Sequence, residues 1–195
     1  MIYLLRHGEI DRKYEKCYIG QIDVPLSPVG LRQAELWKEK LSQVCFDVVY
    51  SSDLIRAVET AEIVSGLNRS DLQVEPNLRE IDLGEWDGVP MQKIRAQFPV
   101  AWKDRGKQIA TFRTPDGESF QDLHDRVVPM FEGIAVNQKG HVLIVAHAGV
   151  LRVILCHAMG KPTRELFSIP QDPAALNQID YRQGMFFVVS QNRTP

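Results

Sequence analysis

The sequence predicts an α/β fold, a three-layer α/β/α sandwich around a mostly parallel central sheet, and three observations support it. Short apolar runs of strand length alternate along the chain with longer stretches of helical periodicity. Residues 2–5 are apolar at every position, as in a strand that is buried on both faces of a parallel sheet. The chain of 195 residues has the length of one domain, here expected to span residues 1–195.

In the first part of the chain we expect three strands and two helices. They are a strand at 2–5, a helix from Pro28, a strand at 46–50, a helix that opens at 51–53 and a strand at 72–74. Ser27 precedes Pro28 as an N-cap precedes proline at the first helical position, and Gly66 marks the end of the second helix. The inner face of the first helix is expected to carry Leu31, Ala34, Trp37 and Leu41.

The later part of the chain begins with a less regular stretch. Residues from about 83 to 118 are rich in Gly, Pro and Trp and predict a helical or irregular insertion over the site. Ser119 and Asp122 form a capping-box pattern at the start of a long helix that runs toward Asn137, with a kink expected at Pro129. The remaining elements are a strand at 141–146, a helix at 150–159 and a hairpin made of 176–181 and 185–189.

The composition is that of an ordinary globular protein, with 44% hydrophobic residues, 25% charged residues and a net charge of −2. Because there is no basic excess, nucleic acid is not expected as a partner, although a local group of arginines can still bind a small anion. The longest apolar run, 142–146, is too short to span a membrane, and the first residues read as a strand, not as a signal peptide. The three cysteines, Cys17, Cys45 and Cys156, are widely spaced, which favours reduced thiols, a cytoplasmic location and no metal site.

Residues suited to phosphoryl chemistry follow the expected strands. The first strand ends in Arg6-His7, the last in Ala146-His147, and Arg56 lies just after the second strand. Because ligands bind beyond the carboxyl ends of parallel strands, these side chains are expected at one rim of the sheet. Arginine binds phosphate oxygens through two parallel hydrogen bonds, and a neutral imidazole can act as a nucleophile. His147 also opens a helix, where free backbone N–H groups favour an anion.

Four ordered segments carry a resemblance to a known family. They are Arg6-His7-Gly8-Glu9, residues 51–57 with Thr60-Ala61, Leu78-Arg79-Glu80-Ile81 through Gly84, and His147-Ala148-Gly149-Val150. Together they resemble the histidine phosphatase superfamily, in its phosphoglycerate mutase-like branch, over residues 1 to about 160. Within that branch the compact length and the region 118–120 are most similar to alpha-ribazole phosphatases, which dephosphorylate a precursor of the cobalamin lower ligand.

The resemblance implies a role for each matched residue. His7 would be the nucleophile that forms a phosphohistidine, and Arg6, Arg56 and His147 would hold the phosphoryl group. Glu80 would protonate the leaving alkoxide and then activate water. Its neighbours Asp82, Glu85 and Asp87 are rival carboxylates. The residues expected to bind substrate are Arg6, Arg56, His147, Lys13, Gly20 and Ala148, and the family implies neither a metal nor another cofactor.

The chain departs from the family pattern after the first segment. Ile10 and Lys13 stand where the family often has a hydroxyl residue and an asparagine, and Lys13 would supply a compensating cation. The basic run of Arg12, Lys13 and Lys16 would be either a solvated loop or a site for a second anionic group of the substrate. Glu9 and Glu118 would be structural or lie at the rim of the pocket, and the structural interpretation is preferred for His124, His141 and His157. Trp86 and Trp102 would either line the substrate site or pack in the core.

The leading interpretation is a metal-independent phosphomonoesterase acting on a small phosphorylated metabolite, with alpha-ribazole 5′-phosphate as the candidate substrate. A cofactor-dependent phosphoglycerate mutase is the alternative, ranked second because mutases of the family are longer and close the site against water. A protein-phosphohistidine phosphatase ranks lower because its short form tends to lack an equivalent of Glu80. A non-catalytic binding module ranks last because all five site residues are present. The sequence leaves the oligomeric state open, a homodimer included.

Overall fold

The computed structural model describes the backbone of residues 1–195 and every side chain except that of Arg12. Its strands form one sheet in the order β3-β2-β4-β1-β5-β6. Their bounds are β1 Ile2–Arg6, β2 Val48–Ser51, β3 Gln73–Val74, β4 Val142–Ala146, β5 Leu176–Arg182 and β6 Met185–Arg193. Strands β1 to β4 are parallel, whereas β5 is antiparallel to β1 and β6 to β5. The mostly parallel α/β sheet expected from the sequence is confirmed.

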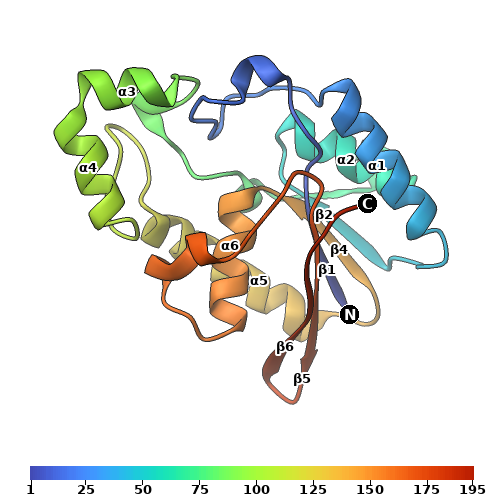
Figure 1. Cartoon of the computed structure of the whole chain (residues 1–195). Helices are drawn as coiled ribbons and strands as arrows, with labels where there is room; N and C mark the ends of the chain where they lie inside the picture. Colours follow the sequence, from blue (N-terminus) through green and yellow to red (C-terminus); the bar gives the residue numbers. More distant parts are fainter.

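Helices cover both faces of this sheet. The long helices are α1 Pro28–Lys40, α2 Ile55–Ser65, α5 Phe120–Asn137 and α6 Ala148–Ala158. Helices α1 and α2 lie together on one face, and α5 and α6 lie together on the other (Figure 1). Each face has its own apolar core: Trp37 and Leu143 belong to the first, and Phe131 and Ile144 to the second. The expected three-layer arrangement is therefore present.

Strand β1 lies in the middle of the sheet, and its position sets the site. Ile2 to Leu5 are buried, because β1 pairs with β4 on one side and with β5 on the other. Arg6 and Ala146 are the last paired residues of β1 and β4, and the N–H of His7 donates to the carbonyl of Ala146 at 3.0 Å. The register thus brings His7 and His147 out of the sheet side by side.

Two expectations about the first helices are wrong. Helix α2 begins at Ile55 and not at residues 51–53, because Ser51 ends β2 and the N–H of Ile55 donates to Asp23 Oδ1 instead of to a local cap. In α1, Ala34 and Trp37 are buried as expected, but Leu31 is 41% exposed. Leu31 follows Gly30 by one position, and it is Gly30 that packs against the backbone of Glu9.

Other local signals are confirmed. Ser119 and Asp122 form both hydrogen bonds of a capping box at the start of α5. Pro129 lies within that helix, and a kink there stays a prediction. Gly66 ends α2 with a φ of 73°, in the left-handed region that glycine adopts without strain. The turn of the β5–β6 hairpin consists of Gln183 and Gly184, both with positive φ, as a two-residue hairpin turn requires.

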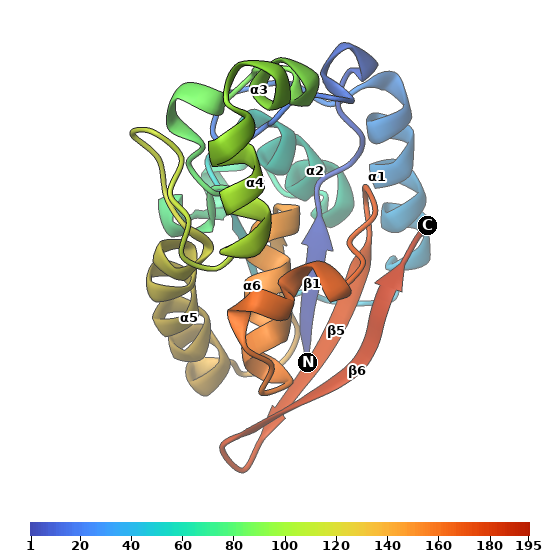
Figure 2. The same ribbon diagram turned by 60° about the vertical axis from the view of Figure 1, so that its left-hand side comes forward.

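The segment from 83 to 118 contains a 3₁₀ turn at Gly84–Trp86 and two short helices, α3 Met91–Gln97 and α4 Pro99–Lys107. These helices lie toward the end of the molecule to which β1 points (Figure 2). Trp86 is a core residue with 1% exposure, whereas Trp102 is 37% exposed on α4. Within the described part of the chain, no helix is both long and apolar enough to cross a membrane.

Candidate active site

His7 is held as a neutral imidazole with one nitrogen free. Its Nδ1 lies 2.7 Å from the carbonyl oxygen of Gly8. Because a carbonyl can only accept, Nδ1 carries the proton and Nε2 keeps its lone pair. Burial, and then the positive charges of Arg56 and Arg6, hold the pKa of His7 well below its usual range. The ring is therefore uncharged at neutral pH, and its Nε2 is available as a nucleophile.

His147 lies beside it, with a distance of 5.1 Å between the two ring centroids. Its Nε2 is 2.7 Å from Oγ of Ser52, and its buried Nδ1 has no hydrogen-bond partner. Burial, followed by the charge of Arg56, also keeps the pKa of His147 well below its usual range. The residue caps α6, so the free N–H groups of the first helical turn lie near the same place.

Two arginines approach the histidines from different elements. Arg56, with 1% exposure, donates through Nη1 to the carbonyl of Ile22 at 2.9 Å and through Nη2 to that of Gly20 at 2.6 Å. Arg6 donates through Nη1 to the carbonyl of Gln171 at 2.6 Å. Burial lowers the pKa of Arg6 to about 10, so it remains charged at neutral pH.

Arg6, Arg56 and His147 each have a buried nitrogen that lacks a hydrogen-bond partner. Among the described side chains, five buried nitrogen or oxygen atoms lack a partner, and three of them are Nε of Arg6, Nε of Arg56 and Nδ1 of His147. Such atoms are rare in folded proteins, and each costs about 1–3 kcal/mol when left unpaired. Three unpaired nitrogens near the ring of His7 suit a tetrahedral anion, which could accept from all of them.

Of the four carboxylates at 80–87 that the sequence offers as proton donor, Glu80 is the one that lies at the cavity with His7. Its Oε2 accepts from the N–H of Gly149 and its Oε1 from the N–H of Ile81, each at 3.0 Å. Glu80 and His7 both line a cavity of about 770 Å³. The three rival carboxylates, Asp82, Glu85 and Asp87, are absent from its wall. Asp87, for example, accepts from three N–H groups of the loop at 20–22.

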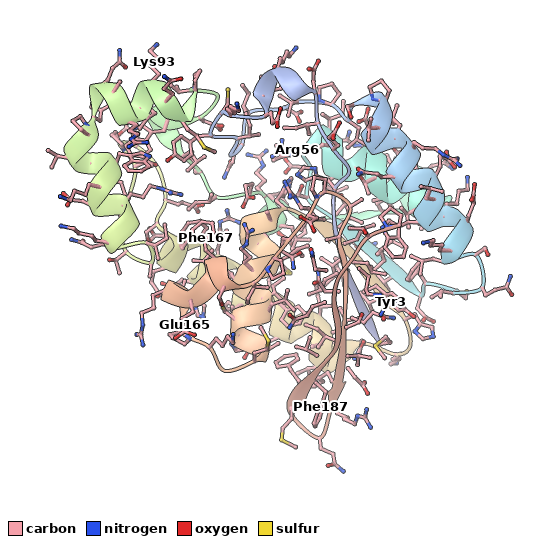
Figure 3. All side chains as sticks on the ribbon, in the orientation of Figure 1. Tyr3, Arg56, Lys93, Glu165, Phe167 and Phe187 are labelled. Carbon is pink, nitrogen blue, oxygen red and sulfur yellow. The ribbon has the colours of Figure 1, made fainter. Side chains whose placement is uncertain are left out.

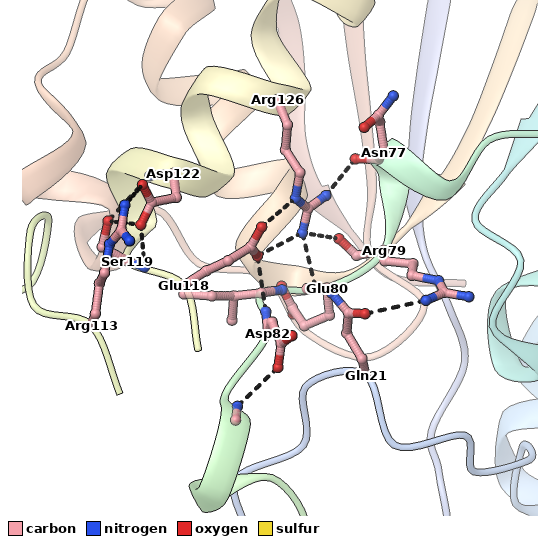
Figure 4. Close-up of polar contacts among 12 residues, drawn as sticks. Gln21, Asn77, Arg79, Glu80, Asp82, Arg113, Glu118, Ser119, Asp122 and Arg126 are labelled. Carbon is pink, nitrogen blue, oxygen red and sulfur yellow. Dashed lines mark hydrogen bonds and ion pairs between the residues drawn. The ribbon is translucent and has the colours of Figure 1, made fainter. Parts of the chain in front are cut away.

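An ion pair that the sequence did not reveal holds the backbone around Glu80 (Figure 4). Arg126 of α5 donates to the carbonyls of Asn77 at 2.6 Å and of Arg79 and Glu80 at 3.0 Å each. Its Nε also lies 2.8 Å from Oε1 of Glu118, while Oε2 of Glu118 accepts from the N–H of Asp82. The structural interpretation of Glu118 fits this contact. Nothing local in the sequence marks Arg126, because its acceptors are backbone carbonyls far away along the chain.

Only some of the six residues expected to bind substrate line the cavity. Of the six, Arg6 and Ala148 line the cavity, whereas Arg56, His147, Lys13 and Gly20 do not. Gly20 instead offers its carbonyl to Arg56, and Nζ of Lys13 lies 3.9 Å from Oδ2 of Asp11. The basic run therefore does not bring Lys13 to the cavity, and the side chain of its neighbour Arg12 is outside the described residues. The cations that the sequence missed in the wall are Arg105 and Arg152.

The other histidines lie away from the cavity. His124 contacts Asp125, His157 lies 3.0 Å from Glu132, and His141 is exposed just before β4. Among the described residues, no group of three or more His, Cys, Asp or Glu side chains is arranged to hold a metal ion.

Comparison with known proteins gives the family. A family model of the histidine phosphatase superfamily (branch 1) matches residues 2–194. The adenosylcobalamin/alpha-ribazole phosphatase of Escherichia coli (strain K12) is 29% identical over 187 residues, which are 93% of this chain and 90% of that protein. A Proteus mirabilis (strain HI4320) protein named "Probable phosphoglycerate mutase GpmB" is 29% identical over 182 residues, 93% of this chain and 85% of its own length.

A solved structure supports the same family. The crystal structure of the alpha-ribazole phosphatase from Shigella flexneri superimposes with a TM-score of 0.89 at 27% identity, over 98% of this chain and 96% of that one. The resemblance carried by the four ordered segments is thereby confirmed, and the phosphatase interpretation fits these relatives better than the mutase alternative. The chain belongs to the histidine phosphatase superfamily, branch 1, as a phosphoric monoester hydrolase that acts on small phosphorylated substrates.

Proposed function

We propose that this enzyme hydrolyses phosphate monoesters in two steps through a phosphohistidine on Nε2 of His7, without a metal ion. The observation that carries the proposal is the free Nε2 of a neutral His7 beside three unpaired donors, Nε of Arg6, Nε of Arg56 and Nδ1 of His147. Phosphoryl transfer depends mainly on positioning and charge stabilisation, and this set of groups supplies both.

In the first step, Nε2 of His7 forms a bond to phosphorus while the bond from phosphorus to the ester oxygen breaks. Glu80 gives a proton to the leaving oxygen, and the alcohol departs. The two arginines and His147 stabilise the charge on the equatorial oxygens. In the second step, a water molecule attacks phosphorus and gives a proton to the Glu80 carboxylate. The bond between phosphorus and Nε2 breaks, and phosphate and free His7 are restored.

The substrate proposed from similarity alone is alpha-ribazole 5′-phosphate, which relatives of this chain are named for. The mutase alternative would return the phosphoryl group to a sugar acid instead of to water.

We also place the enzyme in the cytoplasm, since all three cysteines are free thiols.

The test uses p-nitrophenyl phosphate in the presence of EDTA. Hydrolysis is expected to continue with the chelator and to be lost in His7→Ala. Brief reaction with radiolabelled substrate should give an acid-labile, base-stable label on the protein that is absent from His7→Ala. Turnover that survives the substitution would contradict the mechanism. Transfer of phosphate between glycerate positions faster than its hydrolysis would favour the mutase.

A further inference from the structure

Asp87 holds a short loop of the active site by its backbone. Its carboxylate accepts hydrogen bonds from three N–H groups, with Oδ1 bound to that of Gly20 at 2.7 Å and Oδ2 to those of Gln21 at 2.7 Å and Ile22 at 2.8 Å. Asp87 itself directly follows the 3₁₀ turn at Gly84–Trp86. The carboxylate is thus attached to a regular element, whereas the loop that it holds, residues 20–22, has no helix or strand of its own.

The same loop holds Arg56 on its other side. The two carbonyls that accept from the Arg56 guanidinium belong to Gly20 and Ile22, and the N–H groups of both residues bind Asp87. The carbonyl of Gly20 and the N–H of Gln21 are parts of one trans peptide group, so they point in opposite directions. The cation and the carboxylate therefore bind the two ends of a single peptide group. Figure 3 shows Arg56 in the upper part of the molecule, next to α2.

This arrangement gives Arg56 a nearby negative charge and leaves its remaining donors for a ligand. Burial lowers the pKa of Arg56, and the charges of Glu80, Asp23 and Asp87 oppose that effect. A carboxylate bound directly to the guanidinium in a bidentate pair would compete with a phosphoryl group for the same donors. Acting through the peptide group, Asp87 instead polarises the carbonyl of Gly20 and makes it a stronger acceptor. The Nε of Arg56 stays unpaired.

The loop also lies directly against the segment of the proposed proton donor. A Cβ built on Gly20 would lie only 2.5 Å from the carbonyl oxygen of Ile81. The side chain of Gln21, which Figure 4 shows beside Glu80, donates from Nε2 to the carbonyl of Glu80 at 3.2 Å. The loop that carries the two acceptors of Arg56 is therefore fixed between Asp87 and the Glu80 segment.

We infer that Asp87 is a positioning residue for phosphoryl transfer, which acts through residues 20–22 and keeps the Arg56 guanidinium aimed at the phosphoryl group. This rests on the proposed phosphatase function, in which Arg56 stabilises the transferring group. An asparagine at position 87 would offer one acceptor oxygen, and its amide group would meet backbone N–H groups that need acceptors. The carbonyls of Gly20 and Ile22 would then move, and Arg56 would move with them.

The experiment begins with Asp87→Asn, using p-nitrophenyl phosphate and glycerol 3-phosphate as substrates. We expect kcat to fall about 10- to 100-fold for both esters alike, because the affected charge is on the phosphoryl group and not on the leaving oxygen. The inhibition constant of vanadate, which adopts the geometry of the transferring group, should rise by a similar factor, with a smaller change in KM.

A double-mutant cycle with Arg56→Gln separates positioning from a merely structural role. If Asp87 acts through Arg56, the double variant should lose no more activity than Arg56→Gln alone, whereas independent effects would multiply. Should Arg56→Gln fail to fold, Arg56→Lys takes its place, since an ammonium cannot reproduce the paired bonds to the two carbonyls. Multiplied losses, or a parental inhibition constant of vanadate in Asp87→Asn, would overturn the inference.

Asp47→Asn is the matched control. Oδ2 of Asp47 accepts from the backbone N–H of His141 at 2.8 Å, just before β2 and β4 begin and thus at the other end of the parallel strands. Its loss should lower stability in urea unfolding but leave kcat and vanadate inhibition at parental values. If Asp47→Asn weakened vanadate binding as Asp87→Asn does, the effect would not be specific to the Arg56 loop. Failure of the phosphatase mechanism is seen separately, as p-nitrophenyl phosphate hydrolysis that survives His7→Ala.

Discussion

The backbone N–H of Gly149 donates a 3.0 Å hydrogen bond to Oε2 of Glu80, and the glycine has no side chain that could keep the carboxylate away. A residue of the first turn of α6 thus fixes a carboxylate that belongs to a loop nearly seventy positions earlier. The same helix begins directly after His147. The start of α6 therefore orients both Glu80, the proposed proton donor, and His147, which we propose donates a hydrogen bond to the phosphoryl group.

Gly149→Ala tests this relationship. The added Cβ would overlap Oε1 of Glu80, and the carboxylate must move because it is the flexible end of its side chain. We expect kcat for alkyl phosphates to fall about 100-fold, within the range that misplacing a general acid costs, with a smaller loss for p-nitrophenyl phosphate. Glu80→Gln should show the same dependence on the leaving group. The measurement is kcat for a series of esters that differ in the pKa of the alcohol.

Gly133→Ala is the control for this substitution. Gly133 lies within α5, and a Cβ there would meet nothing within 4 Å. It should keep parental activity and gain about 0.5–1 kcal/mol in the free energy of unfolding. If Gly149→Ala lowered kcat equally for alkyl and aryl esters, Gly149 would not act through proton donation.

Arg126→Gln is expected to lower both stability and proton donation. It removes the donor to three backbone carbonyls, at Asn77, Arg79 and Glu80, and leaves Glu118 without its ion pair. The free energy of unfolding should fall by about 2 kcal/mol, and kcat for alkyl phosphates should fall more than kcat for aryl phosphates. Arg126→Lys should not restore kcat, since an ammonium cannot reproduce the fork of the guanidinium.

The matched control for this ion pair is Arg113→Gln. Arg113 lies 2.5 Å from Asp122, but its side chain is 66% exposed and holds no part of the Glu80 loop. Its replacement should change stability by less than about 1 kcal/mol and leave the dependence on the leaving group unaltered. Urea unfolding and the same ester series measure both effects. If Arg113→Gln and Arg126→Gln behaved alike, the proposed positioning of Glu80 would be wrong.

Ser52→Ala should impair phosphoryl transfer through His147. When the Ser52 hydroxyl donates to Nε2, the proton of the neutral ring stays on Nδ1, which then donates to the phosphoryl group. Without the hydroxyl the other tautomer becomes accessible, and kcat should fall about 10- to 100-fold for alkyl and aryl esters alike. Ser51→Ala is the control, because the Ser51 hydroxyl donates only to the carbonyl of Ser52. Parental kcat in Ser52→Ala would show that the tautomer is fixed in another way.

Stability should depend on pH through His7 and His147. Both are buried, and the pKa of each is well below its usual range, so below about pH 6.5 the unfolded chain binds protons that the folded chain does not. The free energy of unfolding should therefore fall with decreasing pH, by up to about 1.4 kcal/mol per pH unit for each ring. Urea unfolding between pH 7 and pH 5.5 measures this slope. The slope should be smaller in His7→Asn than in the parent protein, and smaller still in the double variant that also carries His147→Asn. Identical slopes in the parent protein and the two variants would refute the interpretation.

Residues at the ends of strands could be found from the sequence, since the pattern that predicts a buried strand also marks where it stops. His7 and His147 are of this kind, and the structure places their rings 5.1 Å apart. Ser52 lies in the stretch that the sequence predicts as a helix start, but its hydroxyl contacts His147, and the N–H of Ile55 at the actual helix start donates to Asp23 of another loop. A cap supplied from a distance leaves no mark in the local pattern.

Arg105 and Arg126 could not be assigned from the sequence for a related reason. Arg126 acts on carbonyls, which every residue has, and Arg105 contacts rings from the loop after β1 and from α5. On a helix, either residue looks like an ordinary solvated cation. The tertiary arrangement gives them their places, whereas the proposed nucleophile, His7, can be found in the sequence because it directly follows the first strand.

The central position of β1 also governs how this enzyme reaches its active form. The strand that ends just before His7 comes early in the sequence, yet both of its neighbours in the sheet, β4 and β5, come from the far part of the chain. Pairing β1 with strands so distant in the sequence requires long loops to close, which slows folding. Until these strands pair, apolar β1 and the loop that follows it stay exposed. Catalytic activity should therefore return late during refolding, after the local helices have formed, and its recovery would report the completion of the sheet.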